Sequence, residues 1–158
     1  MDPDEGSTSA APRLTHVLLA EDDEELRRFL SEVLQKKGYR VTEAQSGDDL
    51  LDRLWERSRR EGKFDLIVSD VRMPGFTGLE VLDGLRDECD PSIGDTPVIF
   101  ITAFGDSEVH AEADRLGAIV FDKPFDVDEL CAYAAEVLNR KALPDGVRGP
   151  DVVAQRNS

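Results

Sequence analysis

Residues 64–75 read Phe64-Asp65-Leu66-Ile67-Val68-Ser69-Asp70-Val71-Arg72-Met73-Pro74-Gly75, an apolar run that ends on Asp70 and leads into a Met-Pro-Gly turn. An apolar run that stops at a polar residue is typical of a buried parallel strand where it leaves the core. Three more apolar runs end in this way, at Glu21, Thr102 and Lys123. Because ligands bind at the carboxyl ends of such strands, we expect these four positions to meet at one edge of a sheet.

Strand and helix patterns alternate five times along residues 14–140. Regular alternation of this kind predicts an α/β doubly wound fold, with a parallel sheet, right-handed crossovers and helices on both faces. The helices are recognised by apolar residues at i, i+3 and i+4, and on this basis Phe29 and Trp55 are expected to face the core. The expected strands are 17–20, 39–43 (the weakest, expected nearer the side of the sheet), 64–69, 98–101 and 119–122.

Two terminal segments are expected to flank this body. Residues 1–13 are rich in Asp, Ser, Ala and Pro and predict a disordered leader, and residues 141–158 predict a flexible tail. Only 18 residues follow position 140, too few for a further output domain. The expected organisation is one domain at 14–140, acting as a stand-alone module.

The chain carries a formal net charge of −15. Nucleic-acid binding needs clusters of Lys and Arg, so no nucleic-acid partner is expected. Cys89 and Cys131 are far apart and lack metal-ligand spacing, which favours reduced thiols over a disulfide or a zinc site. No apolar stretch suits a signal peptide or a membrane span, so a cytoplasmic location is expected.

Asp70 is the candidate reactive group. A carboxylate can attack phosphorus and form an acyl phosphate, and the turn at 73–75 is expected to expose it. Glu21, Asp22 and Asp23 offer the hard oxygen ligands that suit Mg²⁺. We assign Asp22 to the metal, Glu21 to a supporting role and Asp23 to the start of the next helix. A strand-end Asp on its own more often only caps a turn. The other polar residues expected at the same edge favour the reactive role for Asp70.

Thr102 and Lys123 are candidates for binding a phosphoryl group. The Thr102 hydroxyl can donate to a phosphoryl oxygen, although a lone Thr in a strand is usually a packing residue. Lys123 needs a partner for its charge, and a carboxylate or a phosphate supplies one. Pro124 permits a cis peptide, which would aim Lys123 into the crevice.

Together these motifs resemble the receiver domain of two-component response regulators. The resemblance covers about residues 14–140 and implies a flavodoxin-like (βα)5 fold, a five-stranded parallel sheet in strand order 2-1-3-4-5. The motifs that carry it are Leu19-Ala20-Glu21-Asp22-Asp23, the segment 65–78 around Asp70, Ile101-Thr102-Ala103 and Asp122-Lys123-Pro124-Phe125.

The resemblance also implies a phosphoryl site that depends on Mg²⁺. Asp70 would accept the phosphoryl group from a sensor histidine kinase or a phosphotransfer protein. The metal would be held by Asp22, Asp70 and the backbone carbonyl of Arg72, with Glu21 assisting.

The resemblance further implies a switch that reads the phosphoryl group. Thr102 and Lys123 would contact it, and the small Ala103 would leave room for it. In the family, the Thr hydroxyl turns inward on phosphorylation, and an aromatic residue three positions before the lysine rotates with it. Here that position is Val120, and Phe121 follows it.

The expected output surface is the face formed by residues 107–139. It would bind a downstream protein target, preferably one that offers basic residues, or pair two copies of the chain. Val120 predicts a modest shift in population on phosphorylation.

Two other functions remain open. A haloacid-dehalogenase-type phosphatase also uses a strand-end Asp, a Thr, a Lys and Mg²⁺, but that family expects a second Asp where this chain has Arg72. The third possibility is a scaffold that is not phosphorylated.

Overall fold

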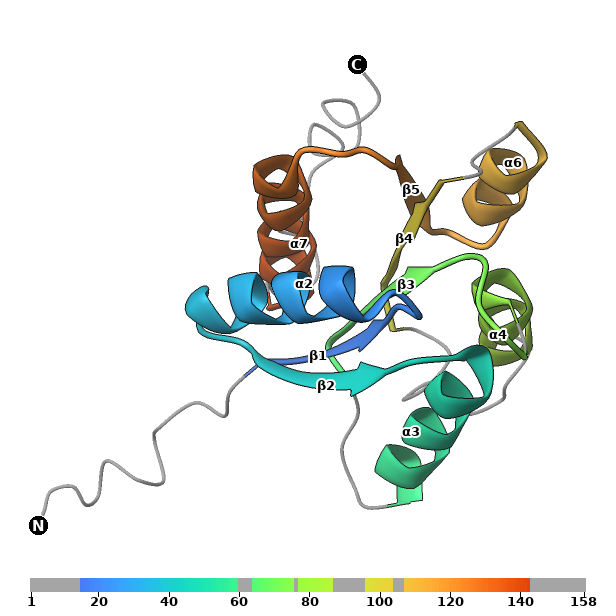
Figure 1. Ribbon diagram of the computed structural model, residues 1–158, viewed down its shortest axis with the longest axis horizontal. Coiled ribbons are helices and arrows are strands. Elements are labelled where there is room, and N and C mark those ends of the chain that lie inside the picture. The colour runs from blue at the N-terminus through green and yellow to red at the C-terminus, as the bar shows by residue number, and fades with distance from the viewer. Residues whose placement is uncertain (1–14, 60–63, 76, 87–95, 104–106, 143–158) are drawn as a thin grey trace, which may run out of the picture.

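The computed structural model describes residues 15–59, 64–75, 77–86, 96–103 and 107–142 (Figure 1). In these residues five strands alternate with five helices. The strands are β1 (His16–Ala20), β2 (Arg40–Ala44), β3 (Leu66–Asp70), β4 (Val98–Thr102) and β5 (Ile119–Asp122). The helices are α2 (Glu24–Lys36), α3 (Gly47–Arg59), α4 (Gly78–Arg86), α6 (Ser107–Arg115) and α7 (Val127–Ala142).

The strands form one parallel sheet in the order β2-β1-β3-β4-β5. The predicted fold and strand order are confirmed, and β2, the weakest strand by sequence, is an outer strand. The register pairs Asp70 of β3 with Ile101 of β4, and Thr102 of β4 with Asp122 of β5. The ends of β1, β3, β4 and β5 therefore lie together on one side of the sheet, which we call the carboxyl edge.

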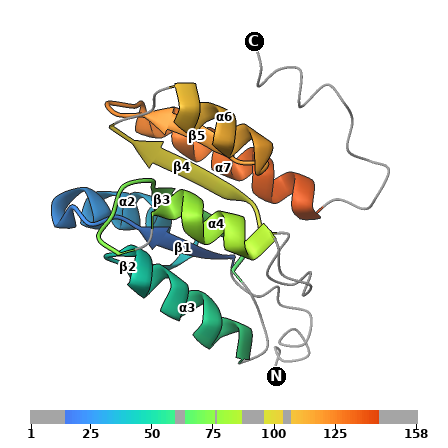
Figure 2. The ribbon, with the colours of Figure 1, turned by 90° about the vertical axis from the view of Figure 1, so that its right-hand side faces the viewer.

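Helices cover both faces of the sheet. Figure 1 shows α2 and α7 on one face, and Figure 2 looks onto α3, α4 and α6 on the other. Along β1, Leu18 joins the core under α3, α4 and α6, whereas Val17 and Leu19 join the core under α2 and α7. Burial on both faces explains why the central strands are continuous apolar runs without polar alternation.

Two aromatic residues do not face the core as predicted. Phe29 on α2 is 50% exposed and Trp55 on α3 is 43% exposed. The buried stripe of α3 runs through Leu50 and Leu54, and Trp55 lies a further 100° around the helix. On α2 the stripe passes through Leu30 and Leu34, which leaves Phe29 outside it for the same reason.

Several predictions fall at or beyond the limits of the described residues. The leader, Cys89 and residues 143–158 lie outside them, while α7 continues past residue 140 to Ala142. Cys131 is free and buried. No helix in the described ranges is both long and apolar enough to cross a membrane.

Gly78 lets α4 begin directly against the strand that carries Asp70. Its N–H donates to the Val71 carbonyl at 2.9 Å. A Cβ at position 78 would lie 2.6 Å from the Asp70 carbonyl oxygen and 2.9 Å from Cε1 of Phe100. The backbone of Asp70 and the start of α4 therefore leave no room for a side chain at this position.

We predict that Gly78→Ala destabilises the protein by about 1–3 kcal/mol, because the added methyl overpacks the contact with Asp70 and Phe100. Gly84→Ala in the same helix is the matched control, since nothing lies within 4 Å of a Cβ there. That variant should gain roughly 0.5–1 kcal/mol from helix propensity. Urea unfolding measures both, and equal stabilities of the two variants would contradict the close approach.

Candidate functional site

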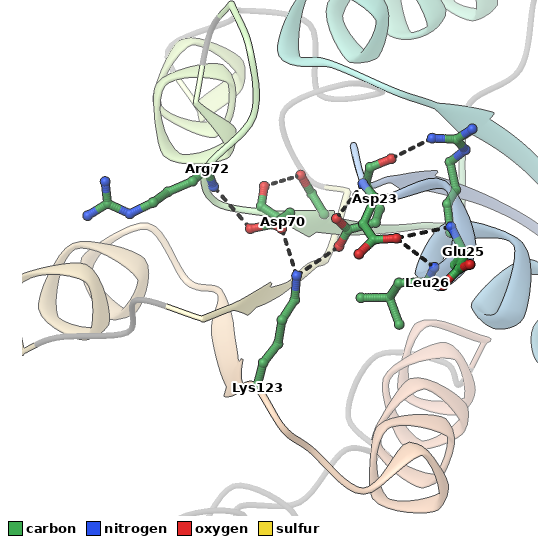
Figure 3. Close-up of polar contacts among 9 residues, drawn as sticks. Asp23, Glu25, Leu26, Asp70, Arg72 and Lys123 are labelled. Atoms are coloured by element: carbon green, nitrogen blue, oxygen red, sulfur yellow. Dashed lines mark hydrogen bonds and ion pairs between the residues drawn. The ribbon is translucent and has the colours of Figure 1, made fainter.

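The predicted site residues meet at the carboxyl edge. Glu21 and Asp22 follow β1, Asp70 and Thr102 end β3 and β4, and Lys123 follows β5. Figure 3 shows Lys123 pointing from the β5 side toward Asp70. The convergence predicted from four separate strand ends is therefore present.

Lys123 bridges two carboxylates. Its Nζ lies 2.9 Å from Oδ2 of Asp70 and 3.2 Å from Oε1 of Glu21. Burial alone would lower the pKa of the Lys123 ammonium, but the hydrogen bonds and charges of Asp70 and Glu21 outweigh it and raise the pKa above its usual value. The backbone N–H of Lys123 donates to the Thr102 carbonyl at 2.8 Å, and the Lys123–Pro124 peptide is cis.

Asp70 is more enclosed than the sequence suggested. We expected the Met-Pro-Gly turn to expose it, but the residue is only 5% exposed. Lys123 holds one carboxylate oxygen, and the Arg72 N–H donates to the other, Oδ1, at 3.0 Å (Figure 3). Both oxygens therefore have fixed directions, which orients the carboxylate.

Glu21 is almost fully buried, at 1% exposed. Burial raises the pKa of its carboxyl to about 7, and the negative charge of Asp70 adds to this effect. The Asp23 N–H, which donates to Oε2 at 3.0 Å, and the Lys123 ammonium act in the opposite direction. Desolvation is therefore the dominant influence on this carboxylate.

Asp22 and Asp23 differ in environment. Asp22 is exposed. Asp23 is the N-cap of α2, and its Oδ1 accepts hydrogen bonds from the N–H groups of Glu25 at 3.0 Å and Leu26 at 3.2 Å (Figure 3). The predicted assignment of Asp23 to the helix start is confirmed.

The acidic residues fit a divalent cation. One carboxylate oxygen each from Glu21, Asp22 and Asp70 can be chosen so that all three lie within 4.8 Å of one another. Three hard oxygen donors, one of them on an exposed residue, suit Mg²⁺, which binds through one or two carboxylates and keeps several waters. A bound cation would also offset the repulsion among the three carboxylates.

The residues of the expected switch come from β4 and β5, and the two on β5, Val120 and Phe121, lie on opposite faces of the sheet. Thr102 is fully buried, while Ala103 is exposed. Val120 packs toward the core under α6, whereas Phe121 packs on the α7 side, with ring centroids 6.4 Å from Phe125 and 6.2 Å from Tyr133. The aromatic ring of β5 is therefore on the face away from α6.

Two pairings near the site were not predicted from the sequence. His110 of α6 lies 3.1 Å from Asp122, the residue before Lys123. Arg27 of α2 contacts the Glu21 carbonyl and the Glu43 side chain. Both pairs join residues from different elements, and the only sequence signal for Arg27 was its position beside the apolar stripe of α2.

Known proteins are similar to this chain in sequence and in fold. A model of the response regulator receiver domain matches residues 17–135. The chain is 35% identical over 130 residues to the transcriptional regulatory protein FixJ of Bradyrhizobium diazoefficiens, covering 82% of this chain and 58% of FixJ. It is 36% identical over 118 residues to the response regulator receiver protein CpdR of Brucella abortus, covering 74% of this chain and 91% of CpdR. The solved structure of the chemotaxis protein CheY4 of Vibrio cholerae superposes with a TM-score of 0.67 at 30% identity, over 79% of this chain and 99% of that one.

A doubly wound α/β domain with an acidic cluster and a lysine at its carboxyl edge defines the class of protein. The chain belongs to the response regulator receiver domain family of two-component signalling. The chain spans little more than half of FixJ, so that comparison concerns only the matched part of FixJ.

We predict that the metal-free protein loses stability as the pH rises from about 4.5 to about 7. Because the pKa of Glu21 is raised from 4.5 to about 7 on folding, the native state binds more protons than the unfolded state in this window. Linkage makes the loss about 3 kcal/mol at most. Glu21→Gln, which mimics the protonated acid, should be stabilising relative to wild type at pH 8 and close to it at pH 4.5.

Urea unfolding in a metal chelator measures this difference at each pH. Glu25→Gln, at an exposed carboxylate of α2, is the matched control and should keep the wild-type loss of stability with pH, because it retains Glu21. A Glu21→Gln effect that stays constant from pH 4.5 to pH 8 would contradict the raised pKa.

Proposed function

We propose that this receiver domain accepts a phosphoryl group on Asp70 in a reaction that requires Mg²⁺. The observation that carries the proposal is the Lys123 ammonium, 2.9 Å from the Asp70 carboxylate at the carboxyl edge. A lysine in this place compensates the charge of the carboxylate before reaction and can bind a phosphoryl oxygen after it. The family membership supports the same reaction.

The proposed step is a displacement at phosphorus. An Asp70 carboxylate oxygen attacks the phosphorus of a phosphohistidine, a P–O bond forms and the P–N bond breaks. The electron pair of that bond returns to the imidazole of the donor, and Asp70 becomes an acyl phosphate. The Arg72 N–H, bonded to Oδ1 of Asp70 at 3.0 Å, orients the attacking carboxylate.

Other residues of this chain stabilise the charge that develops on the phosphoryl oxygens. We assign Lys123 to one such oxygen and the Thr102 hydroxyl to another, and the small side chain of Ala103 leaves access to the site. Mg²⁺, when bound, supplies positive charge to the phosphoryl oxygens. Asp22 and Asp70 would hold it, with the Arg72 carbonyl as a third ligand and Glu21 in support.

The donor we propose is a sensor histidine kinase or a phosphotransfer protein. The response regulators among the relatives imply such partners in general. A phosphatase of the haloacid-dehalogenase type remains disfavoured because Arg72 stands where that chemistry needs an acid.

The output surface we propose is the face formed by residues 107–139. It contains α6, β5 and α7, and His110 links α6 to Asp122 next to the site. This surface favours a protein partner with basic residues, and a second copy of the chain is the alternative partner. The acidic residues it presents include Glu108, Glu112, Asp114, Glu129 and Glu136.

We predict that acetyl phosphate with Mg²⁺ adds one phosphate to the wild-type chain, measured by intact mass. Asp70→Asn should gain none, because the amide cannot act as the nucleophile. A chelator should also prevent the gain. Asp114→Asn, an exposed carboxylate on α6, is the matched control and should be phosphorylated like wild type. Full phosphorylation of Asp70→Asn would overturn the assignment.

A further inference from the structure

Arg27 connects three elements next to Glu21, one member of the acidic cluster. It lies in the first turn of α2, and its side chain is only 14% exposed. One nitrogen, Nη1, donates to the backbone carbonyl of Glu21 at 2.8 Å, and Nε donates to Oε1 of Glu43 on β2 at 3.1 Å. The side chain therefore joins α2, the end of β1 and β2 through a single guanidinium.

The contact with the Glu21 carbonyl fixes the loop that carries the acidic residues. The Glu21 N–H donates to the Ala44 carbonyl at 3.0 Å, so the opposite side of this residue is also held. The carbonyl of Glu21 belongs to the peptide that joins it to Asp22. Holding that peptide restricts the directions from which both carboxylates approach the site.

The positive charge of Arg27 is paired with the carboxylate of Glu43. Glu43 accepts from its Nε and neutralises it. In the cluster of Glu21, Asp22 and Asp70, three carboxyl groups therefore face a single ammonium group, that of Lys123. The remaining negative charge is available to a divalent cation, and Arg27 does not serve as its substitute.

We propose that Arg27 is a positioning residue for the cation site, acting through the Glu21–Asp22 peptide. The inference rests on the Mg²⁺ site of the proposed function. Residues that hold metal ligands in place commonly change metal affinity 10- to 100-fold when mutated. The planar guanidinium suits this role because it makes two directed hydrogen bonds at once, which a lysine cannot reproduce.

A positioning role and a purely electrostatic role of Arg27 predict opposite changes in Mg²⁺ affinity when its side chain is replaced. If Arg27 acted only through its positive charge, its removal would favour binding of a cation. If it positions the loop, its removal weakens binding although the site becomes more negative. The sign of the change in Mg²⁺ affinity therefore distinguishes the two roles.

The experiment compares Mg²⁺ affinity in Arg27→Met, Arg27→Lys and Arg28→Met by titration of the metal-free full chain, followed by NMR. Arg28 is the matched control, because it is the adjacent arginine of α2 and its side chain is 72% exposed in an i,i+4 pair with Glu24. We expect roughly tenfold weaker binding for Arg27→Met. Arg27→Lys should fall between it and wild type, and Arg28→Met should equal wild type or bind slightly more tightly.

High salt adds a second readout, because it screens charge effects but not loop geometry. The ratio of wild-type to Arg27→Met affinity should persist in about 0.5 M salt, well above the concentration at which surface charges are screened. The inference would be overturned if Arg27→Met bound Mg²⁺ as tightly as Arg28→Met or more tightly. If Arg27→Met does not fold, Arg27→Lys with wild-type affinity overturns it. A wild-type chain that binds no Mg²⁺ would instead refute the proposed function.

Discussion

Lys123 holds two carboxylates that would otherwise repel each other in a largely buried site. Its ammonium lies 2.9 Å from Asp70 and 3.2 Å from Glu21. Lys123 follows β5, Asp70 ends β3 and Glu21 follows β1, so the interaction depends on the strand order β1-β3-β4-β5 and on a register that brings the strand ends level. The carboxyl edge is consequently the part of the molecule on which both the fold and the proposed chemistry depend.

The carboxyl edge holds buried carboxylates that lower the stability of the metal-free protein but that the proposed function needs. Desolvation raises the pKa of Glu21 to about 7, so its charged form is disfavoured in the metal-free protein. Buried groups with shifted pKa values cluster at functional sites because the site needs charges that the fold alone would avoid. A divalent cation would relieve this repulsion, and thus metal binding and stability should be linked.

The sequence predicted most of the fold and most of the candidate site, and its failures have two causes. The strand ends at Asp70, Thr102 and Lys123 and the N-cap at Asp23 were predictable because each is a local pattern. Phe29 and Trp55 were placed wrongly because helical periodicity defines a face only to within one residue. The burial of Asp70 and the contacts of Arg27 depend on residues from other elements, which no local pattern contains.

Amide exchange of the full chain with and without beryllofluoride, an analogue of the phosphoryl group, in the presence of Mg²⁺ tests the proposed phosphoryl site most directly. We expect added protection around Asp22 and Asp70 together with changes in residues 107–130, and neither effect in Asp70→Asn. Wild-type exchange that is unchanged by beryllofluoride would contradict a phosphoryl site at the carboxyl edge. Changes confined to the neighbourhood of Asp22 and Asp70 would contradict the proposed output surface.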